Sequence, residues 1–148
     1  MSLFAPICRA LLVLLALGVV TSAAAAEIGQ IKILKGLVTV ERNHRVFPAS
    51  VGMRLETLDV LRTGADGSLG ITMSDDSLLS AGPNSILSLD HYDFDAVTNQ
   101  GRFDAQLQSG SLAVISGRIA KHAPDAMTVR TPAAILGVRG TEFVVSTQ

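Results

Sequence analysis

The sequence is poor in cysteine, in aromatic residues and in charge of either sign. Its 148 residues include one cysteine, no tryptophan and one tyrosine, and 12 Lys and Arg residues nearly balance 13 Asp and Glu residues. A single cysteine excludes an intramolecular disulfide and a cysteine-based zinc cage. A formal net charge of −1 argues against a nucleic-acid partner, because such a partner requires a basic face.

Residue patterns typical of enzymes are also missing. No serine lies in a Gly-x-Ser-x-Gly elbow, and Gly64-x-x-Gly67-x-x-Gly70 has the wrong spacing for a nucleotide-binding loop. The three histidines are far apart in the sequence and form no pair at metal-ligand spacing. We therefore expect no catalytic, metal-binding or cofactor-binding residues, and a protein that is not an enzyme.

Two acidic clusters have simple structural interpretations. Asp90, Asp93 and Asp95 lack the glycine and the distal bidentate glutamate of a calcium-binding loop, so we expect a solvated strand end there. Asp75-Asp76 predicts a turn, because aspartate side chains bond readily to nearby backbone groups.

The first 26 residues have the layout of a secretory signal peptide. A positively charged start over residues 1–9 is followed by an apolar core over 10–20 and by small residues over 21–26. The apolar run is shorter than the roughly 20 residues that a membrane span requires. We predict a signal helix that is cleaved after Ala26, which removes Cys8, and a protein in the periplasm or secreted, without a stable membrane span.

The remaining residues, 27–148, predict one all-β domain. Short segments rich in β-branched residues alternate with turn clusters containing glycine, proline, asparagine and aspartate. The spacing favours a compact two-sheet β-roll of short antiparallel strands, solenoid-like or sandwich-like, and does not choose between them. Lys35-Gly36 indicates a hairpin or a bent strand. The predicted strands are 31–34, 37–40, 58–63, 68–74, 78–81, 85–91, 102–108, 111–116, 127–130 and 141–147, with a turn at Ser109-Gly110 between two of them.

Several motifs together resemble the FecR-type domain. They include Leu58-Asp59-Val60-Leu61-Arg62-Thr63-Gly64, Gly82-Pro83-Asn84-Ser85 and, most specifically, the closing Thr131-Pro132-Ala133 to Gly137-Val138-Arg139-Gly140-Thr141-Glu142-Phe143. Leu58-Asp59 departs from the Gly-Asp that is usual in the family. The resemblance implies an all-β periplasmic domain that transmits signals through protein contacts, between an outer-membrane transporter and an inner-membrane sigma-factor regulator.

We expect the fold and the interaction class to carry over, but not transcriptional regulation, because a cleavable leader precedes the domain here. The motif residues to which we assign a structural or interaction role are Asp59, Thr63, Gly64, Gly82, Pro83, Ser85, Thr131, Pro132, Gly137, Arg139, Gly140, Thr141, Glu142 and Phe143.

Arg139 has two interpretations. Its planar guanidinium suits a structural clamp that bonds loop carbonyls or a buried carboxylate such as Asp59, and it equally suits recognition of an anionic group on a partner. The clamp is the simpler interpretation.

The leading functional hypothesis is a periplasmic interaction or signalling accessory module that binds another envelope protein through a sheet edge or loop face. The alternative is a module that binds cell-wall glycan. Exposure of Tyr92 and Phe94 beside the aspartates would favour glycan, and their burial would favour protein. The sequence leaves the oligomeric state open.

Overall fold

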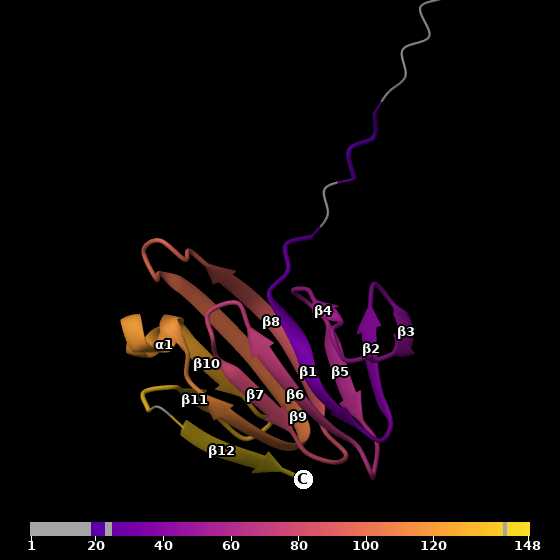
Figure 1. Cartoon of the computed structure of the whole chain (residues 1–148). Coiled ribbons are helices and arrows are strands. Elements are labelled where there is room, and N and C mark those ends of the chain that lie inside the picture. Colours follow the sequence, from indigo (N-terminus) through magenta and orange to yellow (C-terminus); the bar gives the residue numbers. More distant parts are fainter. Residues whose placement is uncertain (1–18, 23–24, 141) are drawn as a thin grey trace, which may run out of the picture.

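The computed structural model describes residues 19–22, 25–140 and 142–148 (Figure 1). The predicted signal helix lies outside these residues, apart from its last few positions. The elements are β1 (Gly29–Lys35), β2 (Val38–Arg42), β3 (Arg45–Pro48), β4 (Arg54–Leu55), β5 (Val60–Thr63), β6 (Ser68–Met73), β7 (Leu78–Ala81), β8 (Ile86–Phe94), β9 (Gly101–Ile115), α1 (Arg118–His122), a 3-10 turn (Pro124–Ala126), β10 (Met127–Arg130), β11 (Ile135–Gly137) and β12 (Glu142–Thr147).

Among the described residues, no helix has the length and apolar character needed to cross a lipid bilayer.

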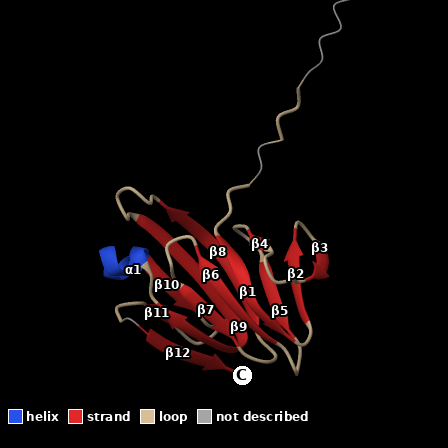
Figure 2. Ribbon diagram, in the orientation of Figure 1, coloured by secondary structure: helices blue, strands red, loops and turns tan. Residues whose placement is uncertain are grey.

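The chain is mostly β, as predicted, and its strands form one connected sheet that curls on itself (Figure 2). The first half of the sheet contains β1, β4, β6, β7, the end of β9 and β12. The second half contains β2, β3, β5, β8, the start of β9, β10 and β11. All pairs are antiparallel except β9 with β10. The sheet is therefore continuous rather than divided into two separate sheets.

Strand β9 joins the two halves. Its first part pairs with β8 and β10. Residues 110–115 pair with β12 on one side, and residues 112–115 also pair with β7 on the other side. Gly110 lies between the parts with a φ of 89°, a conformation that glycine adopts without a Cβ penalty. The predicted turn at Ser109-Gly110 is thus wrong in one respect: the strand bends there and continues without reversing.

Three chain reversals carry the backbone from one half of the sheet to the other: the first lies between β1 and β2, the second between β5 and β6, and the third between β7 and β8. The three reversals lie next to one another. The Gly64 amide donates to the carbonyl of Leu37 in the first reversal (2.8 Å), and the Asn84 amide of the third reversal donates to the Gly64 carbonyl (3.1 Å). Of the two alternatives predicted at Lys35-Gly36, the hairpin is wrong, because β1 pairs with β4 and β6 whereas β2 pairs with β3 and β5. The chain bends at Gly36 and changes sheet half.

The core lies between the inner faces of the two halves. In β6, the residues Leu69, Ile71 and Met73 are buried and alternate with more exposed neighbours, as expected for a strand with one face toward the core. Phe103 of β9 is the largest fully buried side chain and comes from the second half. Aliphatic residues supply most of the remaining core, as the scarcity of aromatic residues predicted.

The predicted strands correspond to nine observed ones, with 102–108 and 111–116 merged into β9. Three strands and the short helix α1 were not predicted. Strand β3 contains Arg45 and Pro48, β4 has two residues and β11 has three. All three are marginal strands, so the local sequence carries little of the strand pattern.

Candidate interaction surface

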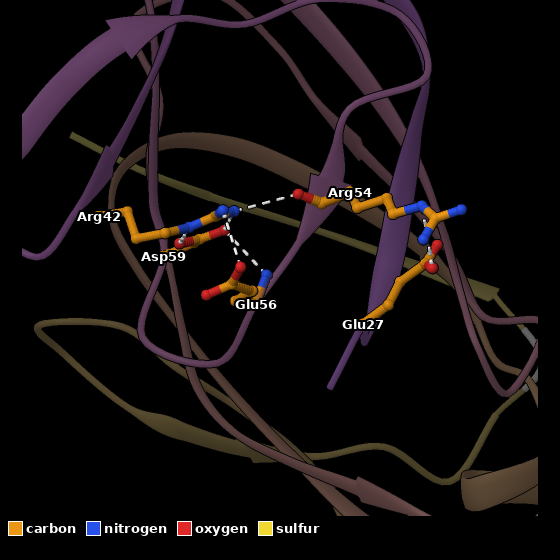
Figure 3. A network of polar contacts seen from close by, with 5 residues as sticks. All are labelled: Glu27, Arg42, Arg54, Glu56 and Asp59. Carbon is orange, nitrogen blue, oxygen red and sulfur yellow. Dashed lines mark hydrogen bonds and ion pairs between the residues drawn. The ribbon is translucent and has the colours of Figure 1, made fainter. Parts of the chain in front are cut away.

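Asp59, the first motif residue, lies in a closed polar cluster (Figure 3). It is fully buried, and the Arg42 guanidinium donates to both of its oxygens, from Nε at 2.7 Å and from Nη2 at 2.6 Å. Arg42 also donates to Glu56 Oε1 (2.9 Å) and to the carbonyl of Arg54 (3.0 Å). Hydrogen bonding to Asp59 raises the pKa of Arg42. The Arg42 guanidinium makes four hydrogen bonds inside the cluster, which supports a structural role for the pair.

The clamp on Asp59 is therefore Arg42, and the prediction that Arg139 occupies this position is wrong. The Arg139 side chain is 74% exposed and pairs with Asp125 (3.0 Å), which is equally exposed. Arg42 stands outside the motif stretches, so sequence reasoning did not single it out. Its only signal was its position at the end of the apolar strand Val38-Thr39-Val40.

A second group of motif residues holds the chain reversals together. Thr63 Oγ1 donates to the Gly82 carbonyl (2.6 Å) and accepts from the Ser85 amide (2.9 Å). Ser85 Oγ donates to the same carbonyl (2.8 Å) and accepts from the Ser111 amide (3.0 Å). Thr63 and Ser85 are buried, and Gly64 and Pro83 lie in the same reversals. The buried hydroxyls of Thr63 and Ser85 therefore stabilise the fold.

A buried carboxylate that the sequence suggested only as part of a turn is the centre of another network. Asp75 lies in a turn, as predicted, but it is also fully buried. It accepts hydrogen bonds from the Ser77 hydroxyl (2.8 Å), the Ile119 amide (3.2 Å) and the Tyr92 hydroxyl (3.2 Å). Ser77 Oγ in turn accepts from the Gly117 amide (2.9 Å). The network anchors α1 against the sheet.

Tyr92 and Phe94 are occupied by contacts within the protein. The Tyr92 ring packs edge-on against Phe103 with centroids 5.2 Å apart, and burial followed by the charge of Asp75 raises the pKa of its hydroxyl. The Arg118 guanidinium lies over the Phe94 ring, 4.8 Å from its centroid. Both rings are half-buried. Phe94 also lines an open hollow of about 590 Å³ together with Asp93 and Asp95, so the two rings show neither the exposure expected for glycan binding nor the full burial expected for protein binding.

The aspartates near these rings bond to protein groups. Asp93 pairs with His91 (2.8 Å) and accepts from the Arg102 amide (3.1 Å), while Asp95 caps the following loop by accepting from the Val97 amide (2.8 Å). Within the part of the chain that the structure describes, no three His, Cys, Asp or Glu side chains gather closely enough to hold a metal ion.

The closing motif stretch forms β11, β12 and their connections. Thr131 and Pro132 lie in the β10–β11 turn, where Thr131 exchanges hydrogen bonds with Ala134. Gly137 faces Thr128 across the sheet. Gly140 accepts a hydrogen bond from Ser116, Glu142 is exposed on β12, and Phe143 is half-buried against the core. Thr141 lies outside the described residues.

Strands β11 and β12 border an open margin of the protein. Each pairs with a neighbouring strand on one side only within the described chain, and β12 forms the lower margin in Figure 1. A hollow of about 350 Å³ lies at this margin, lined by Leu136, Gly137, Val138, Arg139, Gly140, Phe143 and Val144. The structure thus brings Gly137, Arg139, Gly140 and Phe143 of the motif together there, whereas Asp59 and the reversal residues lie elsewhere.

A second hollow, of about 250 Å³, lies on the outer face of the first half of the sheet. Paired residues form a row across five strands, with small residues between two exposed aliphatic ones: Ile33, Gly70, Ser80, Ala113 and Val144. The side chains of Leu78 and Ile115 stand in the next row and are also partly exposed. We call this surface the apolar hollow.

Charges border the apolar hollow on two sides. Lys32 of β1 lines one side and Glu142 of β12 lines the opposite side. The outer face of the second half is different, because it carries ion pairs such as Arg62 with Glu41 and Arg102 with Asp104. Four exposed aliphatic residues, Ile33, Leu78, Ile115 and Val144, gather on the outer face of the first half.

Burial would raise the pKa of Asp104, but hydrogen bonds from Arg102 and Thr128 outweigh burial and lower this pKa.

Apart from Glu142 on its border, none of the residues of the apolar hollow was singled out by sequence reasoning. Gly70, Ser80 and Ala113 come from three different strands, and each is unremarkable in its own segment. Only the strand register brings them together.

Comparison with known families agrees with this fold. The family model described as FecR protein matches residues 59–148, which is more than half of the chain. The chain therefore belongs to the FecR protein family, a family of signalling-related domains that are typically periplasmic. No curated protein and no solved structure matches the chain significantly.

Proposed function

We propose that this protein is an exported, non-enzymatic FecR domain that acts as an interaction or signalling accessory module by binding another envelope protein. The observation that carries the proposal is the apolar hollow, because several exposed apolar side chains gather around one depression and such a patch is typical of a binding site. Family membership supports the signalling context, and the predicted leader supports export.

The chemistry of the hollow defines the partner segment. Small residues at Gly70, Ser80 and Ala113 leave room above the sheet for an apolar side chain. Lys32 and Glu142 on opposite sides favour a segment that carries an acidic group at one end and a basic group at the other. We therefore infer that the partner presents an apolar segment with charged ends.

The proposal is tested by photo-crosslinking in the cells that make the protein. A photoreactive amino acid is introduced at Ile33 or Ala113 in the hollow and, as a control, at Val97, which is 92% exposed in the β8–β9 loop. We expect both hollow positions, and not Val97, to crosslink to the same envelope protein, which mass spectrometry identifies.

A second variant links this result to the hollow itself. Leu78→Asp places a charge beside the apolar hollow. Because Leu78 points outward from the sheet, we expect the fold to remain and the crosslinks from Ile33 to be lost. Recovery of glycan alone, or equal recovery of one protein from Val97, would overturn the proposal.

A further inference from the structure

Strand β12 is a six-residue edge of the described sheet, and its one charged side chain is Glu142 at its start. Exposed edges are normally blunted by lysine, arginine, proline or very short strands. Strand β3 carries Arg45 and Pro48, β4 has two residues and β11 has three. Strand β12 has six residues, with neither lysine nor proline, and its central Val144 is 70% exposed. Its edge is thus competent to accept another strand.

The inner side of β12 is also incompletely covered. Phe143 and Val145 pack against the core but are only half-buried, and Phe143 lines the open hollow beside β11. A strand added to this edge would bury more of both side chains, provided that it presented apolar residues inward.

The sequence of β12 is complementary to itself when two copies run antiparallel with Val144 opposite Val144. Directly opposed residues then point to the same face of the sheet. On the inner face, Phe143 meets Val145 of the second copy, an aromatic and β-branched pair. On the outer face, Glu142 meets Ser146, and the two Glu142 carboxylates lie at opposite ends of the paired strands.

Other antiparallel registers fit less well. Centring the pair on Phe143 places Val144 of each copy opposite Glu142 of the other copy. Centring it on Val145 places Val145 opposite Val145 but also Val144 opposite Ser146 and Phe143 opposite Thr147, so one apolar pair remains in place of three. The register centred on Val144 is therefore favoured.

We propose that two copies of this protein associate through antiparallel pairing of their β12 strands about a two-fold axis at Val144. Such a contact is isologous and closes on itself, so it produces a dimer and not a filament. Because six residues per chain are few compared with the 20–30 of a standard interface, we expect a concentration-dependent dimer. This inference does not rest on the proposed partner, but the two surfaces meet at β12, because Glu142 borders the apolar hollow and Val144 ends its row.

Single cysteines test the register. Cys8, the one cysteine of the chain, is first replaced by serine. Val144→Cys then faces its own symmetry mate across the two-fold axis, at a separation close to that of a disulfide. Ser146→Cys is the matched control, because it lies on the same face and strand but is offset from its mate by roughly 13 Å along the strands.

Under mild oxidation we expect Val144→Cys to form a disulfide-linked dimer and Ser146→Cys to stay largely monomeric at the same protein concentration. Equal crosslinking of both variants, or crosslinking of Ser146→Cys alone, would overturn the register.

Sedimentation of the chain without added cysteines supplies a second measurement. We expect the wild-type chain and the Val97→Lys variant to show the same monomer–dimer equilibrium, and Val144→Lys to be monomeric with an unchanged unfolding midpoint. A wild-type chain that stays monomeric up to millimolar concentration would overturn the dimer and leave the edge to a strand of another protein.

Discussion

At the scale of single residues, burial of polar groups explains three of the motif residues, Asp59, Thr63 and Ser85. Asp59 is removed from water and receives hydrogen bonds from Arg42 and from the Glu56 amide. Thr63 and Ser85 satisfy backbone groups in the reversals in the same way. These residues maintain the fold, whereas other residues form the exposed candidate surface.

Arg42→Ala tests this structural role. The substitution leaves Asp59 buried without its cation, and breaking a buried pair by removing one partner costs about 3–5 kcal/mol. We expect at least half of this loss, since Arg42 is partly exposed and water can reach the vacated position. The free energy of unfolding from urea denaturation measures the effect.

Arg62→Ala is the matched control for this measurement. Arg62 lies on the neighbouring strand β5 and pairs with Glu41 at 3.4 Å, both side chains being partly exposed. Exposed pairs contribute about 0–1 kcal/mol. Equal losses in the two variants would contradict a special role for the Arg42–Asp59 pair.

At the scale of elements, the sequence predicted the central strands better than the margins. Alternation of apolar and polar residues is strong in β6 and β10, whose positions were correct to within a residue. It is weak in β3 and β11, where proline and glycine interrupt it. The sequence around Gly36 could not distinguish a hairpin from a crossing between sheet halves, because both need the same local turn.

Gly110 is the element-scale test of how β9 joins the two halves. A Cβ at this position would lie 2.4 Å from the Ser85 Cα, and the backbone has a positive φ. Left-handed strain of about 1–2 kcal/mol and overpacking of about 1–3 kcal/mol both oppose the side chain. We therefore expect Gly110→Ala to lower the free energy of unfolding by about 2–5 kcal/mol, measured by urea denaturation.

Gly137→Ala in β11 supplies the comparison. A Cβ there has no neighbour closer than Asp125 Oδ1 at 3.9 Å, and the backbone needs no positive φ. We expect a change within about 0.5 kcal/mol. A Gly110→Ala variant as stable as Gly137→Ala would show that β9 bends by other means.

At the scale of the whole molecule, the domain is larger than its family match. The match begins at Asp59, but β1 pairs with β6 and β2 pairs with β5. Ile31, Val38, Val40 and Leu55 from the preceding segment are buried in the common core. Residues 29–55 therefore belong to the same folding unit as the matched part.

Truncation tests this unity. A chain of residues 59–148 would expose the edges of β5 and β6 and lose the four core side chains named above. We expect residues 27–148 to show strand-type circular dichroism and one cooperative thermal transition, and residues 59–148 to show neither. A cooperative transition in the shorter chain would place the domain boundary at Asp59.

The candidate surface was the least predictable feature at this scale. The closing motif directed attention to the margin that holds Arg139 and Phe143, and the structure places an open hollow there. The row from Ile33 to Val144 could not be predicted, because it depends on the register of five strands that are distant in sequence.

The start of the sheet lies very close to the predicted cleavage point. Ile28, two residues beyond Ala26, is buried. Its amide donates to the carbonyl of Leu55, and its carbonyl accepts from the amide of Ser74. A peptidase needs several residues on each side of its target bond in an accessible, extended form. Once Ile28 docks, that freedom is lost, so we predict that a cleavage after Ala26 takes place before the fold is complete.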